Sequence, residues 1–295
     1  MPVVQTPFRP DGGLDADCLL RELHWVLDQG VSGLTTGMVS EVLRLDETER
    51  FELATLVTSV AHERGALAVI SCGAESTVQA VRYARQASDI GAQGIMVIPP
   101  TTVALDEEAT FEYFTTIAAA SPLALVVQDA SSYVGQPLSI PLQARLHREL
   151  GDQVYFKPEA APLGQRLSQL RDATQGAART FEGTGGVNLV DGFHRGVVGS
   201  MPGAEVCWAV EAMWRALNTG DEVRAYRINA YLALLINLQT SLDSYVAVEK
   251  HLLWRQDVLE RTDARGPSGY VLDRETATEA DRLLELLQTA TYAED

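Results

Sequence analysis

The clearest indication of the fold of this chain is the stretch ALAVISCGAESTVQAVRYARQASDIGAQGIMVI, residues 66–98. It holds an apolar run at 68–72, a helical pattern at 76–90 and a second apolar run at 94–98. Gly91 follows the helical pattern, where a glycine commonly ends a helix in a left-handed conformation. Two short apolar runs joined by such a helix predict parallel strands connected by a helical crossover.

The same alternation of apolar runs and helical patterns extends on both sides of this stretch. Two more helical patterns, 15–29 and 46–64, also end just before a glycine. The predicted strands are 3–6, 33–36, 68–72, 94–98, 124–128, 154–157, 179–182 and 196–200. Because eight strand–helix units are enough to close a sheet on itself, they favour an α/β fold, a (β/α)8 TIM barrel, over an open sheet.

Additional helices follow the eighth unit. The helical patterns cover 205–217, 222–254 and 276–290, and a loop is predicted at 265–272. These helices exceed what a barrel needs, and no flexible linker separates them from it. We therefore predict a barrel over residues 1–217 and a C-terminal helical extension over 218–295 that packs on the barrel as a cap or an oligomer contact.

Composition excludes several classes of function. A formal net charge of −17 repels phosphate backbones and anionic lipid, so neither nucleic acid nor a membrane is an expected partner. No run approaches the length of a membrane span, and the first residues lack the pattern of a signal peptide, so a cytoplasmic location is expected. Cysteines and histidines are scattered without metal-ligand spacing, so no metal and no cofactor is predicted.

Lysine is rare in this chain, which contains only Lys157 and Lys250. Lys157 ends the apolar run 154–156, and a lysine that loses hydration beside apolar walls becomes a nucleophilic neutral amine. The alternative is that an arginine-biased composition left two lysines by chance. Lys250 lies between Glu249 and His251 in a helical pattern, and we expect it to be a solvated or salt-bridged surface residue.

Polar residues are predicted at the carboxyl ends of several strands, where TIM barrels carry their active sites. Glu159 follows Lys157 in its loop, as a candidate acid or base, and Gln128 ends the neighbouring strand. The turn 37–40 offers backbone N–H groups to a carboxylate, and the turn 183–186 is a candidate small-anion nest. The alternative for both turns is an ordinary loop between a strand and a helix.

Several short motifs together carry a resemblance to a known family. They are Thr6-Pro7-Phe8 followed by 11–15, Gly30-Val31-Ser32-Gly33, Gly91-Ala92 with Pro99-Pro100, Tyr155-Phe156-Lys157, and 196–200. In these motifs nearly the whole chain resembles the dihydrodipicolinate synthase and N-acetylneuraminate lyase superfamily, class I Schiff-base enzymes on a (β/α)8 barrel. The resemblance implies that Lys157 forms an imine with a 2-keto acid whose carboxylate binds at 37–41.

The chain departs from the family pattern at two places. The family turn usually reads Gly-Thr-Thr-Gly-Glu, whereas residues 37–41 read Gly-Met-Val-Ser-Glu, so carboxylate binding would rest on backbone N–H groups and Ser40. The family tyrosine that shuttles protons is replaced by Gln128, and Thr101 and Thr102 replace an aromatic pair. Tyr133 is a candidate for a phenol supplied from a shifted position.

The triplet Gln128-Asp129-Ala130, combined with Lys157-Pro158-Glu159, is most similar to the 2-keto-3-deoxy-L-arabinonate dehydratase branch. This resemblance implies a Schiff-base lyase on a small 2-keto acid, foremost a dehydratase of a 2-keto-3-deoxy sugar acid. The alternatives are a pyruvate-dependent aldolase and a non-catalytic barrel that binds a keto acid or a protein partner. A homo-oligomer, tetramer or dimer, is also implied.

The candidate site residues fall into two groups. The catalytic candidates are Lys157, Gln128 and Glu159. The substrate-binding candidates are Gly37, Met38, Val39, Ser40, Tyr133, Gly183, Val198 and Ser200.

Overall fold

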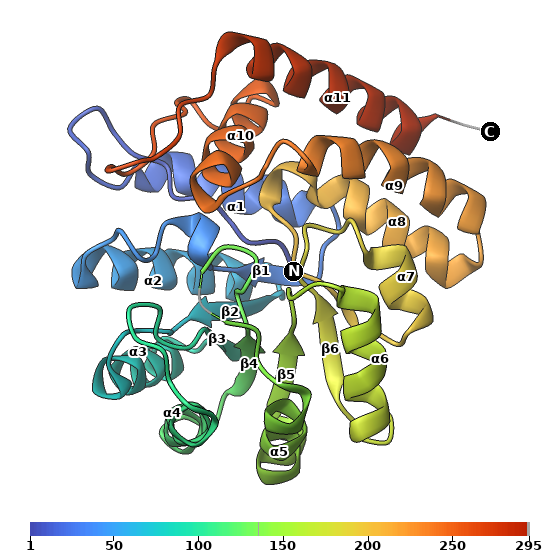
Figure 1. Ribbon diagram of the computed structural model, residues 1–295. Coiled ribbons are helices and arrows are strands. Elements are labelled where there is room, and N and C mark those ends of the chain that lie inside the picture. Colours follow the sequence, from blue (N-terminus) through green and yellow to red (C-terminus); the bar gives the residue numbers. More distant parts are fainter. Residues whose placement is uncertain (135, 294–295) are drawn as a thin grey trace.

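The computed structural model describes residues 1–134 and 136–293. Its centre is a curled sheet of seven parallel strands in chain order, with helices outside it (Figure 1). The strands are β1 (Gly33–Thr35), β2 (Leu67–Ser71), β3 (Gly94–Val97), β4 (Ala124–Gln128), β5 (Val154–Lys157), β6 (Arg179–Glu182) and β7 (Gly199–Ser200). Since every strand runs the same way, all carboxyl ends lie on one face of the sheet.

Six helices connect successive strands, as the alternating pattern predicts, while one helix precedes β1 and one follows β7. They are α1 (Ala16–Asp28), α2 (Glu47–Glu63), α3 (Thr77–Asp89), α4 (Glu107–Ala119), α5 (Ile140–Leu150), α6 (Leu163–Ala173), α7 (Leu189–His194) and α8 (Cys207–Thr219). Short 3-10 turns are η1 (Met38–Ser40), η2 (Gly151–Gln153) and η3 (Ala204–Val206). Gly91 has a φ of 86°, a conformation that glycine adopts at little cost, and it ends α3 where the sequence predicts.

The first predicted strand, 3–6, is not a strand in the structure. Val3 instead forms isolated parallel bridges with Thr35 and with Gly203, on the two edges of the sheet. Its N–H donates to the carbonyl of Pro202 at 2.7 Å, and the N–H of Val4 donates to the carbonyl of Thr35 at 2.9 Å. The architecture is therefore TIM-barrel-like, with seven assigned strands and an N-terminal segment bonded to both edges.

The last predicted strand is also shorter than expected. The pattern indicates 196–200, but only Gly199 and Ser200 pair with β6. Gly196 has a φ of 89°, so the backbone before the pair is not extended in the way a strand requires. This shortening moves the start of β7 past Val198.

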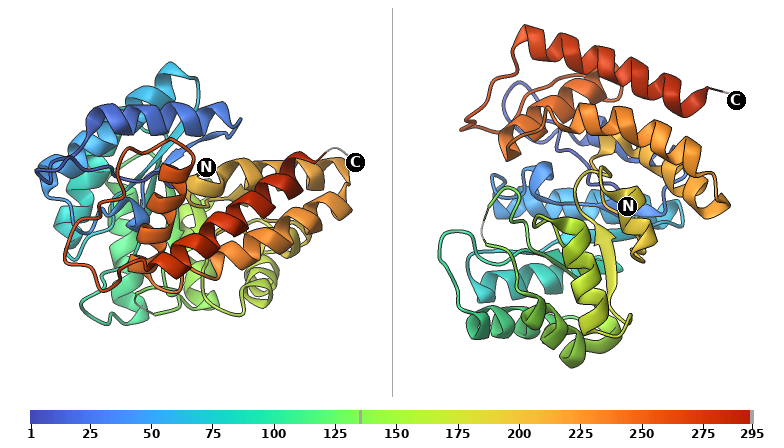
Figure 2. Two further views of the ribbon diagram at one scale, coloured as in Figure 1. Left: turned by 90° about the horizontal axis from the view of Figure 1, so that it is seen from above. Right: turned by 45° about the vertical axis from the view of Figure 1, so that its right-hand side comes forward.

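The C-terminal region contains α9 (Glu222–Ile236), α10 (Leu242–Arg255) and α11 (Arg274–Tyr292). The prediction of one helix over 222–254 is therefore wrong, because the helix ends before Asn237 and a new one begins after Ser241. Ser241 caps α10, accepting from the backbone N–H of Ser244 at 3.2 Å. Figure 2 shows the three helices, orange to red, gathered on one side of the molecule.

Apolar packing joins this region to the barrel helices. Leu232 of α9 and Leu287 of α11 are fully buried in one cluster with Met213 of α8.

Among the described residues, no helix has the length and apolar content that crossing a membrane requires. Cys18, Cys72 and Cys207 are buried and free. The predicted loop at 265–272 lies between α10 and α11, as expected.

Candidate active site

Lys157 lies at the carboxyl end of β5, where the barrel prediction places it. It is paired in register with Gln128 at the end of β4, and the two residues are 5% and 4% exposed. Side chains at the ends of neighbouring parallel strands meet at the same edge of the sheet, which brings an amine and an amide into one buried place. The structure therefore joins two residues that lie far apart in the sequence.

Glu159 completes a buried polar triad with these residues. Its Oε1 accepts hydrogen bonds from Lys157 Nζ and from Gln128 Nε2, each at 2.6 Å. Its Oε2 is buried and has no hydrogen-bond partner among the described residues. Burial raises the pKa of the Glu159 carboxyl, although Lys157 and Gln128 act in the opposite direction. A carboxyl with a raised pKa and a free oxygen is suited to take up and return protons.

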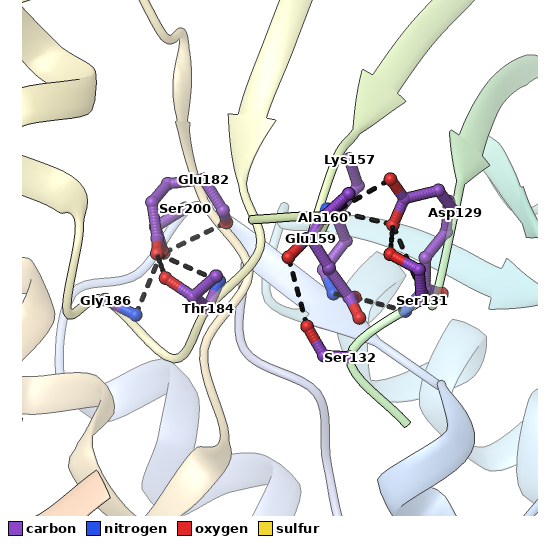
Figure 3. A network of polar contacts seen from close by, with 11 residues as sticks. Asp129, Ser131, Ser132, Lys157, Glu159, Ala160, Glu182, Thr184, Gly186 and Ser200 are labelled. Atoms are coloured by element: carbon purple, nitrogen blue, oxygen red, sulfur yellow. Dashed lines mark hydrogen bonds and ion pairs between the residues drawn. The ribbon is translucent and has the colours of Figure 1, made fainter. Parts of the chain in front are cut away.

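Asp129 holds the loop that carries Glu159 (Figure 3). Its Oδ1 accepts from the backbone N–H of Glu159 at 3.0 Å and from the Ser131 hydroxyl at 3.2 Å, and its Oδ2 accepts from the N–H of Ala160 at 3.4 Å. Ser132 donates its hydroxyl to the Glu159 carbonyl at 3.1 Å. Sequence reasoning did not assign Asp129 this role, because its partners belong to the loop after the next strand.

Ser40, an expected carboxylate-binding residue, does not line the cavity beside Lys157. Its hydroxyl accepts from the N–H of Gly37 at 3.0 Å and donates to the carbonyl of Val4, and the residue is fully buried. Met38 and Val39 line the cavity beside Lys157, and the first N–H groups of a helical turn have no partner within that turn. A carboxylate at this turn would therefore be held by backbone N–H groups alone.

Glu182, at the end of β6, is a buried residue that the sequence did not single out. Its carboxylate accepts from the backbone N–H groups of Thr184 and Gly186, both at 2.9 Å, and from the Ser200 hydroxyl at 2.7 Å (Figure 3). These bonds hold the turn 183–186 against β7. The Ser200 hydroxyl is thus engaged with Glu182, and Ser200 does not line the Lys157 cavity.

Of two other predicted binding residues, Gly183 lines the cavity and Val198 does not. Gly183 lines the cavity, and a Cβ atom there would lie 3.0 Å from the Cγ atoms of both Lys157 and Glu159, so only glycine fits without a shift. Val198 is not brought to the site. It precedes the amino end of β7, its side chain is 43% exposed, and it lines a separate cavity together with Val31.

The cavity beside Lys157 has apolar walls. Three methionines, Met38, Met96 and Met201, contribute to them. Tyr133 and Tyr245 also line it, with their rings in an edge-to-face contact at 6.1 Å. Burial, followed by the charge of Glu159, raises the pKa of the Tyr133 phenol, which therefore stays protonated as a hydrogen-bond donor. Tyr245 was missed by sequence reasoning because it comes from α10, outside the predicted barrel.

The prediction that Lys250 lies on the surface is wrong. It is fully buried rather than on the surface, and its ammonium donates to the carbonyls of Thr6 and Asp263, both at 2.8 Å. It also pairs with the carboxylate of Glu41, the last residue of the turn 37–41. Glu41 in turn accepts from the N–H of Arg265 at 2.6 Å. The C-terminal region therefore anchors the turn that borders the cavity.

Comparison with known proteins agrees with this geometry. The model of the dihydrodipicolinate synthetase family matches residues 1–286. The chain belongs to this family, whose members include lyases and dehydratases.

Three similar proteins illustrate the range. An L-2-keto-3-deoxyarabonate dehydratase of Azospirillum brasilense is 30% identical over 79% of this chain and 77% of its own length. A protein of Streptomyces avermitilis named "Probable 5-dehydro-4-deoxyglucarate dehydratase 1" is 27% identical over 76% of this chain and 72% of its own length. The 4-hydroxy-tetrahydrodipicolinate synthase of Methylacidiphilum fumariolicum SolV has the same fold, with a TM-score of 0.87, 21% identity and coverage of 98% and 95%.

Proposed function

We propose that this chain is a Schiff-base lyase that dehydrates a 2-keto-3-deoxy sugar acid. The observation that carries the proposal is the contact between Lys157 and Glu159 at the end of a cavity, with one Glu159 oxygen left without a partner. A purely structural ion pair would leave no room beside the amine. The similarity to two sugar-acid dehydratases supports the choice of reaction.

Imine formation would begin with a proton transfer within the buried pair. The Glu159 carboxylate, whose pKa is raised by burial, takes a proton from the Lys157 ammonium and leaves a neutral amine. The amine adds to the C2 carbonyl of the keto acid, and loss of water gives a protonated imine. The carboxylate of the substrate would meanwhile be held by the N–H groups of Met38 and Val39.

Dehydration then follows from the acidity that the imine confers on C3. A proton leaves C3 for a carboxylate oxygen of Glu159, the C3 electrons form an enamine, and these electrons expel the C4 hydroxyl as it takes up a proton. Gln128 would hold the Glu159 carboxylate in place through its amide. Water adds to the conjugated imine, frees Lys157 and releases an unsaturated 2-keto acid, so the net change is the loss of one water.

Borohydride trapping tests this proposal directly. Incubation with pyruvate and sodium borohydride should add one reduced pyruvyl group, and peptide mapping should place it on Lys157. Absence of an adduct under conditions where the protein is folded would reject the whole class of reaction. Thermal stabilisation by pyruvate without an adduct would instead identify a non-catalytic barrel that binds keto acids.

A pyruvate-dependent aldolase is the second candidate, and the position of Tyr133 favours it. This phenol lines the same cavity as Lys157 and remains protonated, so it could serve the aldehyde oxygen that a carbon–carbon cleavage releases. Product analysis separates the two reactions. An aldolase yields pyruvate and an aldehyde, whereas a dehydratase yields one product that is lighter than the substrate by one water.

Three structural proposals accompany the function. Residues 2–4 complete the (β/α)8 barrel through their bonds to both sheet edges. The described part of the C-terminal region, residues 218–293, forms a helical extension that packs on the barrel. The chain forms a homo-oligomer, dimer or tetramer, supported by three exposed apolar side chains on α9, Val223, Tyr226 and Leu234. Light scattering at several concentrations tests the last proposal, and a mass of one chain throughout would reject it.

A further inference from the structure

The cavity beside Lys157 is poor in positive charge. Among its described lining residues, Lys157 is the only lysine, arginine or histidine, and its ammonium is already in contact with Glu159. If imine formation consumes this amine and the turn at Met38 and Val39 holds the substrate carboxylate, no cationic group of the lining remains. A second anionic group on the substrate would find no charged partner there.

The wall of the cavity at Gly203 is backed by buried carboxyls. Gly203 lines the cavity, and behind it Glu205 and Glu249 are both fully buried. A Cβ atom on Gly203 would lie 2.9 Å from Glu249 Oε1 and still closer to Glu205 Oε2, so only glycine admits these carboxyls to the wall. Each has one oxygen without a hydrogen-bond partner among the described residues.

Among the described residues, no cation forms an ion pair with Glu205 or Glu249. Lys250 is adjacent to Glu249 in the sequence, but it pairs with Glu41 and donates its remaining protons to two backbone carbonyls. Burial raises the pKa values of both Glu205 and Glu249, and the proximity of Glu205 raises the pKa of Glu249 further. Burial, followed by the nearby carboxylate of Glu159, raises the pKa of the Tyr133 phenol in the cavity wall.

We propose that the substrate is a 2-keto acid with a single carboxylate and an uncharged tail, and that the site rejects dicarboxylates. This inference rests on the proposed function and narrows it to one substrate class. A tail carboxylate entering the cavity would lose hydration and face carboxyl groups behind Gly203 without gaining an ion pair. An uncharged tail avoids both costs. The site thus favours a keto acid derived from a sugar acid with one carboxylate, such as arabonate, over one derived from a sugar acid with two, such as glucarate.

The experiment compares three keto acids on the unmodified protein. Pyruvate reports imine formation alone, 2-oxoglutarate carries a second carboxylate, and its 5-methyl ester has the same carbon chain with that charge masked. Each is trapped with cyanoborohydride, and the rate of adduct formation on Lys157 is followed by intact mass. We expect the ester to react at least tenfold faster than 2-oxoglutarate at equal concentration and at equal ionic strength.

The outcomes separate this inference from the proposed function. No adduct with pyruvate would reject imine chemistry itself. A pyruvate adduct together with equal or faster trapping of 2-oxoglutarate relative to its ester would overturn the charge selection while leaving the imine intact. Equal failure of the ester and 2-oxoglutarate, with pyruvate reactive, would also overturn it, because tail length rather than tail charge would then be the cause.

Discussion

The two lysines of this chain occupy two buried ion pairs that differ in one respect. Lys157 and Glu159 lie beside a cavity, and Glu159 keeps an oxygen without a partner. Lys250 and Glu41 do not, since Lys250 donates to two carbonyls and Glu41 accepts from a further backbone N–H. Rarity and burial are therefore shared by both lysines, and neither property distinguishes a chemical role from a structural one.

The difference lies in what each pair has left to bind. A pair whose donors and acceptors are all engaged can only hold chain segments together, and Lys250 holds α10 against the turn 37–41. A pair with an open oxygen and adjacent space can exchange protons with a ligand. Substitutions in these two pairs, and at one further buried carboxyl, test whether free hydrogen-bonding capacity separates a chemical role from a structural one.

Replacing Lys157 should have the largest effect. Lys157→Arg keeps a positive charge but removes the nucleophilic amine, so activity should fall roughly a thousandfold or more, and no borohydride adduct should form. Turnover with a candidate sugar keto acid and intact mass after trapping measure the two effects. Circular dichroism serves as the control for folding. A variant that still turned over at a similar rate would end the imine mechanism.

Glu159→Gln should separate proton transfer from binding. The amide retains the shape of the side chain but cannot take up a proton, so we expect kcat to fall by roughly 10²–10⁴ while KM changes little. The pH dependence of kcat should lose the limb that reports this carboxyl. Asp129→Asn is a matched control for a positioning role, because it perturbs the loop without touching the Lys157 amine. Unchanged kcat in Glu159→Gln would assign the proton transfers to another group.

Lys250→Met should affect stability rather than chemistry. It leaves Glu41 buried without its cation, which typically costs about 3–5 kcal/mol of unfolding free energy. The double variant Lys250→Met with Glu41→Gln removes both charges and should recover much of this loss. Urea unfolding measures both variants. If the double variant were as unstable as the single one, the loss would come from packing rather than from an unpaired charge.

Glu22→Gln tests a buried carboxyl that no cation pairs with directly. Burial raises the pKa of Glu22 to about 8, and its Oε1 accepts from the N–H of Gln5 at 2.7 Å. The folded chain therefore holds this proton between pH 4.5 and about 8, where the unfolded chain has released it. The unfolding free energy should fall as pH rises through this window, with a slope of up to about 1.4 kcal/mol per pH unit from this group.

The variant should flatten this slope without abolishing it, because other buried carboxyls contribute. Glu22→Gln no longer titrates, so its unfolding free energy should change less between pH 5 and pH 8 than that of the unmodified chain. Denaturant midpoints at several pH values in one buffer series provide the measurement. Equal slopes for the two proteins would show that Glu22 is ionised in the folded state.

Much of the fold could be predicted because its signals are local. The run 66–98 carries an apolar strand, an amphipathic helix and a terminating glycine within one short segment, and β2, α3 and β3 form where it indicates. The segment 3–6 failed as a strand because isolated bridges at a sheet edge depend on distant partners, Thr35 and Gly203. The helix break at 237–241 was not predicted, because a helical pattern lies on each side of it.

The candidate site was partly predictable for the same reason. Lys157, Glu159 and Gln128 end or follow recognisable strands, so their place at the carboxyl edge follows from the strand assignment. The hydrogen-bond partners of Ser40 and Lys250 could not be predicted from the sequence, because they depend on which polar atoms remain unpaired after folding. Tyr245 could not be found, because it reaches the cavity from a helix beyond the barrel.

Local patterns along the chain indicated the alternation of strands and helices, the family resemblance and the lysine at a strand end. These properties depend on periodicity and on short motifs, which are readable along the chain. The tertiary structure was needed to show which hydroxyl, carboxyl and ammonium groups are hydrogen-bonded within the protein and which face a cavity. Hydrogen-bond saturation depends on residues brought together from distant segments, as Lys250 is with Thr6 and Glu41.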